Sequence, residues 1–171
     1  MEKFKGWLPT EDLLFSGDAN KWEEKYFQEF QLDIAFIYDA AFQQGIEAPR
    51  PWETPEMAIP RLLEQWHSLK DDLARNFANR DRANAEESMK AAICLFIEML
   101  YWTNGIPVHF PLDNMDTLKA KPMNIEDRVS FIMSRPNHYQ SYKQLAELMI
   151  EQEKLFAKTL LLKKIKKNVR E

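Results

Sequence analysis

The sequence predicts an all-α protein that folds as a single domain, residues 1–171, with about five main helices. Apolar residues recur every three or four positions over several long segments, which is typical of helices that each bury one face. Only 4 of the 171 residues are glycine, and no Asn-Gly turn stands between alternating strand patterns. With 45% hydrophobic residues, a chain of this length can bury a substantial core.

The same composition excludes several functional classes. Few glycines disfavour P-loops, dinucleotide-binding loops and β folds rich in tight turns. A single cysteine, Cys94, excludes an intramolecular disulfide and a cysteine-based zinc site, and it favours a reducing cytoplasm. The longest apolar run, 91–97, is far shorter than the ~20 residues of a membrane-spanning helix, so we expect no transmembrane segment.

The N-terminal half is predicted to hold two helices joined by a proline-rich connection. The first helix is predicted over 21–44 and ends at Gly45. Residues 47–60 contain four prolines and are predicted to form a structured crossover. The second helix is predicted over 61–77, and a polar turn follows at 79–82.

The third predicted helix, 84–103, is the centre of the fold. From Ile93 to Trp102 it is apolar on nearly every side, which is typical of a helix surrounded by others. Asn104-Gly105 is a favourable pair to end it. A connection follows over 106–122, with one short helical turn expected near 113–118.

Two further helices are predicted in the C-terminal part. Asn124 and Asp127 resemble a capping box that opens a helix ending near Ser134, before Pro136. Asn137 is predicted to cap the last helix, 138–168, which would be about 45 Å long at ~1.5 Å per residue.

The net charge of −4 hides two oppositely charged parts. Residues 154–171 carry seven bases and one acid, a net charge of +6, so the rest of the chain carries −10. The basic residues share the last helix with apolar residues at helical spacing, and the last ten or so residues form either a projecting or a docked helix end. The candidate binding residues here are Lys163, Lys164, Lys166 and Lys167.

Three interpretations of this basic helix remain open. In the first, it is a solvated face with cations placed favourably at a helix C-terminus. In the second, it binds a partner protein, or it docks on the acidic body of this chain or of a second copy, which would form a homodimer. In the third, it binds nucleic acid or an anionic membrane surface. A protein partner is favoured over nucleic acid, because the acidic body would repel phosphate groups beyond this one helix.

Glu98 is the second unusual feature, because it lies within the most apolar helix of the chain. An unpaired carboxylate is costly there, so we expect a salt bridge to an arginine or a histidine of a neighbouring helix. The alternative is a pocket carboxylate with a raised pKa that acts as an acid or a base. Glu64-x-x-His67 has the spacing of one half of a di-iron site, and it supplies the groups that would join Glu98 in an enzyme pocket. With half of a symmetric motif only, we expect no metal, no cofactor and no catalytic residue.

The third feature is the predicted break between the last two helices. It places a cation, an amide, an imidazole and a phenol side by side at Arg135, Asn137, His138 and Tyr139. Together with the free N–H groups of the next helix, these side chains are candidates to hold a carboxylate or a phosphate. The structural alternative is a capping box with tyrosines that pack on the adjoining helix.

The C-terminal part of the sequence resembles a known family. The segments that carry the resemblance are 124–128, Phe131-Ile132, 135–139 and 152–154, within a similar region of about 95–160 anchored also by Tyr101-Trp102 and the Pro107 loop. They are similar to the YpoC-like family of uncharacterised helical proteins from Bacillus-type bacteria. The resemblance implies a bacterial protein of the cytoplasm, and it brings no activity, cofactor or active site.

From these features we expect a non-enzymatic interaction or accessory protein that uses the basic C-terminal helix, the break at 135–142, or both. The alternatives are a nucleic-acid-associated accessory protein and, third, a helical-bundle enzyme with a pocket near Glu98.

Overall fold

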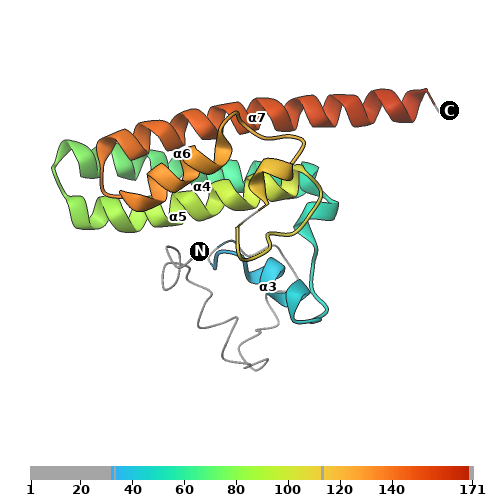
Figure 1. Ribbon diagram of the computed structural model, residues 1–171, viewed down its shortest axis with the longest axis horizontal. Helices are drawn as coiled ribbons and strands as arrows, with labels where there is room; N and C mark the ends of the chain where they lie inside the picture. Colours follow the sequence, from blue (N-terminus) through green and yellow to red (C-terminus); the bar gives the residue numbers. More distant parts are fainter. Residues whose placement is uncertain (1–31, 33, 113, 170–171) are drawn as a thin grey trace.

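The computed structural model describes residue 32 and residues 34–112 and 114–169, which form five α-helices, two short 3₁₀ helices and no strand. The predicted all-α, single-domain fold class is confirmed for these residues. In chain order the elements are α3 (Ile37–Gln43), η3 (Pro51–Glu53), α4 (Pro55–Ala78), α5 (Arg82–Thr103), η4 (Met115–Thr117), α6 (Ile125–Ser134) and α7 (Tyr139–Asn168). Figure 1 shows α4 to α7 side by side in one elongated bundle, with α3 below one end.

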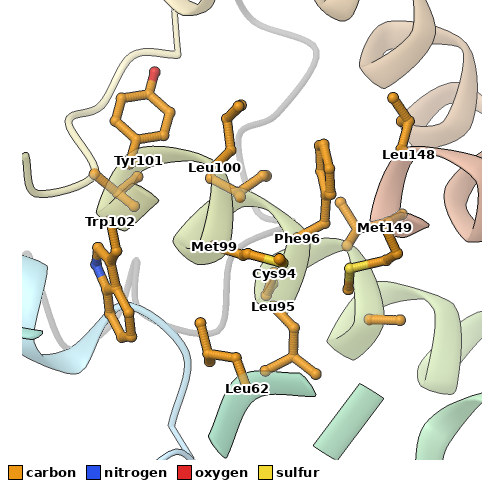
Figure 2. Packing of buried hydrophobic residues seen from close by; sticks show 14 of the residues in the cluster. Leu62, Cys94, Leu95, Phe96, Met99, Leu100, Tyr101, Trp102, Leu148 and Met149 are labelled. Carbon is orange, nitrogen blue, oxygen red and sulfur yellow. The ribbon is translucent and has the colours of Figure 1, made fainter. Parts of the chain in front are cut away.

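The predicted central helix is confirmed as α5. Every residue from Ala92 to Thr103 is buried, on all sides of the helix. Figure 2 shows the surrounding side chains, with Leu62 of α4 on one side and Leu148 and Met149 of α7 on another. The apolar run therefore folds as a helix that other elements cover all round.

Short polar turns and caps hold the ends of α5. At its start the Asp81 side chain accepts a hydrogen bond from the backbone N–H of Asn84 at 3.2 Å, which satisfies one of the free donors of the first turn. At its end Gly105 has φ +73, a backbone angle that favours glycine, and the predicted end at Asn104-Gly105 is confirmed.

Asn104 also ties the connection after α5 to the helix end. Its Nδ2 donates to the carbonyl of Leu100 at 2.8 Å and of Ala120 at 3.0 Å. Its Oδ1 accepts from the backbone N–H of Lys119 at 3.1 Å and of Ala120 at 2.8 Å. One amide side chain thus holds residues 119–120 beside the last turn of α5.

The predicted start of the first helix, near residue 21, lies outside the described residues, as do 22–31 and 33. Within the described part residues 34–36 are not helical, contrary to the prediction, because Phe36 takes a left-handed conformation with φ 60, and α3 begins at Ile37. The predicted start of the second helix is wrong. The second helix begins at Pro55, six residues before the prediction, and contains Pro60. Pro60 lies on the exposed side near the helix start, where water reaches the carbonyl that lacks its usual N–H partner.

The predicted cap at Asn137 is wrong, and the predicted capping box at Asn124 does not form. Asn124 is the N-cap residue of α6, as predicted, but it has a left-handed conformation with φ 53 and its side chain makes no capping hydrogen bond. The N-cap of α7 is His138, again without a side-chain cap, while Asn137 Nδ2 donates to Glu86 Oε2 of α5 at 3.5 Å. The helices α6 and α7 themselves are confirmed, and so is the short helical turn at η4.

We expect Asn104→Ala to lower the free energy of unfolding by about 2 kcal/mol, because it removes hydrogen bonds to four backbone groups. The carbonyl of Ala120 keeps a second donor, Gln152 Nε2, while the other three groups are left to water or to no side-chain partner. Urea unfolding followed by circular dichroism measures this change. Asn79→Ala is the matched control, since Asn79 is the exposed residue that ends α4. Equal losses in both variants would contradict the role of Asn104.

Candidate functional site

Glu98 does not form the predicted salt bridge. The side chain is buried, with 3% of its surface exposed, and its Oε1 accepts a hydrogen bond from the backbone N–H of Phe36 at 2.7 Å. No arginine or histidine of the described chain pairs with it. Phe36, which has a left-handed conformation just before α3, is thus hydrogen-bonded to α5.

A second carboxyl group, Asp39 of α3, is buried near Glu98. Asp39 Oδ1 accepts from Trp102 Nε1 at 3.1 Å and from the backbone N–H of Val108 at 2.6 Å, whereas Oδ2 is buried without a hydrogen-bond partner. Burial raises the pKa of Asp39 to about 6. Burial and the charge of Asp39 raise the pKa of Glu98 well above its usual value.

This carboxyl pair connects three parts of the fold. Asp39 binds α5 and the connection after it, and Glu98 binds the turn that opens α3. The sequence signal for Asp39 was a single acid within the apolar stretch 34–42, and sequence reasoning missed it.

The other members of the predicted enzyme pocket lie elsewhere. Glu64 and His67 are exposed on α4, while Glu98 is buried, so these three groups do not converge. Among the described residues no group of three histidine, cysteine or acidic side chains is arranged to hold a metal ion. Cys94 is buried as predicted, and burial raises the pKa of its thiol far above the usual range.

The break between α6 and α7 borders an open cleft of about 370 Å³. Of the predicted residues, Asn137, His138 and Tyr139 line it, and Arg135 does not. The other wall comes from the end of α4 and the turn to α5, with the lining residues Asn76, Phe77, Arg80, Asp81 and Arg82. Sequence reasoning missed the two arginines, because a polar turn carries no signal of what it faces.

Aromatic side chains join α4 to α7 beside this cleft. The ring of Tyr139 lies 5.7 Å from that of Phe77 and 5.8 Å from that of Tyr142, measured between centroids. Phe77 and Tyr142 are 5.5 Å apart. Tyr139 and Tyr142 therefore pack on the adjoining helix α4, as the structural alternative predicted.

The end of α7 extends past the bundle, as Figure 1 shows in red. All residues from Leu161 to Val169 are exposed, including the four predicted lysines 163, 164, 166 and 167. Leu161 is 59% exposed and Ile165 is 50% exposed, although both are large aliphatic side chains. This part of the helix buries no apolar face against its own core.

Helical geometry explains why the apolar residues leave the core. Buried residues of α7 such as Leu145, Met149 and Phe156 define its core-facing side. At about 100° per residue, Lys163 and Lys167 continue that side, whereas Leu161 and Ile165 lie roughly opposite. The apolar pattern that continues through the sequence therefore turns outward once the bundle ends.

A second, largely apolar cleft of about 330 Å³ lies beside the helix end. Leu162, Thr159 and Ala120 contribute to its wall, and the side chains of Lys119, Lys163 and Lys166 also line it. Three cations thus border a recess with aliphatic walls.

The comparisons with known proteins place the chain in a family. The model of the YpoC-like protein family matches residues 56–164. The chain belongs to this family. It is 36% identical over 122 residues to the "Uncharacterized protein YpoC" of Bacillus subtilis (strain 168), which covers 68% of this chain and 73% of that protein. No solved structure matches the chain.

The family match extends beyond the region on which the resemblance was based. It takes in α4 and all residues that line the cleft at the α6–α7 break, while Asp39 and Ile165 lie outside it.

Within the described residues, no helix is both long and apolar enough to span a bilayer.

We expect Asp39→Asn to change the pH dependence of stability. The unfolded carboxyl ionises near pH 4 and the folded one near pH 6, so the wild-type chain loses stability as the pH rises through this window. The asparagine side chain retains an oxygen for the Trp102 and Val108 donors and does not ionise. Between pH 4 and pH 7 the free energy of unfolding of the variant should therefore rise, relative to that of wild type, by up to about 3 kcal/mol.

Urea unfolding at several pH values measures this difference. The exposed Asp116→Asn is the control, since its side chain lies at the surface. A difference between Asp39→Asn and wild type that stays constant from pH 4 to pH 7 would contradict the burial of an ionisable pair.

Proposed function

We propose that the chain is a non-enzymatic interaction module of the bacterial cytoplasm, and that the free end of α7 binds an acidic segment of a partner protein. The observation that carries this proposal is the exposure of Leu161 and Ile165 on the side of α7 that faces away from the bundle. Exposed aliphatic side chains at helical spacing, flanked by charge, are how helices commonly dock in a groove of another protein.

The charge around this surface favours an acidic partner. At about 100° per residue, Lys164 borders the outward apolar side, whereas Lys163, Lys166 and Lys167 lie on the core-facing side. Carboxylates of a partner would approach four lysines over fewer than two helical turns, and such a field accelerates association and disfavours basic partners.

The cleft beside the helix end lies on the other side of α7 from Leu161 and Ile165, since Lys163 and Lys166 line it. It is therefore separate from the proposed docking surface. The lysines that border it, Lys119, Lys163 and Lys166, add to the positive charge around the helix end and so to the attraction of an acidic partner.

We expect the double variant Leu161→Ser, Ile165→Ser to bind its partner at least about tenfold more weakly than wild type, because both contacts lie on the outward side. The partner is first recovered from extract of the source bacterium with the wild-type chain, then purified. Titration calorimetry between the two purified proteins gives the dissociation constants.

Ile150→Ser is the matched control, since Ile150 is 50% exposed on the same helix within the bundle. The proposal requires that this control binds like wild type and that added salt weakens binding. Equal affinities for the wild-type chain and the double variant would overturn it.

Nucleic acid is the second candidate, favoured only by the lysine cluster 163–167. Binding to DNA or RNA at about 50 mM salt would then depend on Lys163, Lys164, Lys166 and Lys167 and be indifferent to Leu161→Ser, Ile165→Ser. Self-association that is lost in the serine variant would indicate a second copy of this chain as the occupant.

A further inference from the structure

We propose that the cleft between the α4–α5 turn and the start of α7 binds a small phosphate-bearing molecule with a planar ring, such as a nucleoside monophosphate. This site is independent of the surface at the end of α7. The 30-residue helix α7 separates the two by about 40 Å, at ~1.5 Å per residue.

Two arginines provide the charge that a phosphate requires. Arg80 and Arg82 both line the cleft, are exposed, and form no ion pair within the described part of the chain. Asp81, the carboxylate between them, also lines the cleft; its two oxygens accept hydrogen bonds from Asn84 N and Nδ2 at 3.2 and 2.7 Å, and it pairs with neither arginine. The guanidinium groups are therefore available to a ligand, and their fork of donors suits phosphate oxygens.

The opposite wall adds polar side chains, and no acidic residue on this side lines the cleft. His138, which caps the start of α7, lines the cleft, and its side chain accepts no hydrogen bond from the helix. The first N–H groups of a 30-residue helix then point toward this end of the bundle. On the α4 wall the amide side chain of Asn76 also lines the cleft, whereas Asn137 Nδ2 already donates to Glu86.

Aromatic rings supply the second half of the recognition. Tyr139 lines the cleft, is 53% exposed, and is supported by its edge-to-face contact with Phe77, at 5.7 Å between centroids. A ring held in this way and open to solvent on its other side is a platform on which a nucleobase stacks. The cleft volume of about 370 Å³ lies within the usual range of small-molecule sites.

NMR titration of the full chain with adenosine monophosphate, inorganic phosphate and adenosine tests this proposal. We expect the monophosphate to bind, with shifts confined to residues 76–82 and 137–139, and to bind more tightly than either fragment. The double variant Arg80→Asn, Arg82→Gln should weaken binding at least about tenfold. Asparagine is chosen at position 80 because Arg80 has φ 56, which asparagine tolerates.

Arg61→Gln is the matched control, since Arg61 is an exposed arginine near the other end of α4. Thermal unfolding of each variant verifies that the fold is kept. Three outcomes would overturn the proposal: no binding at millimolar monophosphate, equal affinity in the double variant and the control, or phosphate alone binding as tightly as the monophosphate.

Discussion

The fold depends on one constraint: the C-terminal half of α5 is apolar all round and must be covered on every side. The twelve residues from Ala92 to Thr103 are all buried, which no single neighbouring helix can achieve. α4 packs along one side and α7 along another, while η3 and the connection after α5 complete the cover. Apolar burial is the main favourable contribution to folding, so the arrangement of the other elements follows from the need to bury this helix.

The buried carboxyl pair is the exception within this cover, and it has a structural explanation. Transfer of Asp39 and Glu98 into the core costs free energy, which the hydrogen bonds from Trp102, Val108 and Phe36 offset in part. In return these bonds specify where α3 and the connection after α5 meet the bundle. Apolar contacts alone are not directional and would leave that placement less defined.

Much of the fold could be predicted from sequence, and the predictions that were wrong share one cause. Local signals predicted the central helix, its end at Asn104-Gly105 and the long last helix, because the spacing of apolar residues and the residues that start or end a helix are read within one segment. The missing capping box at Asn124, the cap of α7 at His138 and the partner of Glu98 were not, because tertiary contacts decide them. The cleft was only half predicted, since its arginines come from a turn more than fifty residues before His138.

The same constraint explains why α7 has two different parts. As far as Leu160 its apolar residues pack on the core; beyond that residue lysines continue the core-facing side, and Leu161 and Ile165 face outward. A helix end with this distribution gains nothing from its own core, so its apolar residues are available to another molecule.

Hydrogen exchange of the free, dilute chain, resolved by residue along α7, tests this division most directly. The account predicts strong protection of the backbone amides from Leu145 to Phe156, near the level of global unfolding, and much faster exchange from Leu161 to Val169. Protection of the last two turns equal to that of the bundle would contradict it, because those residues would then already be covered.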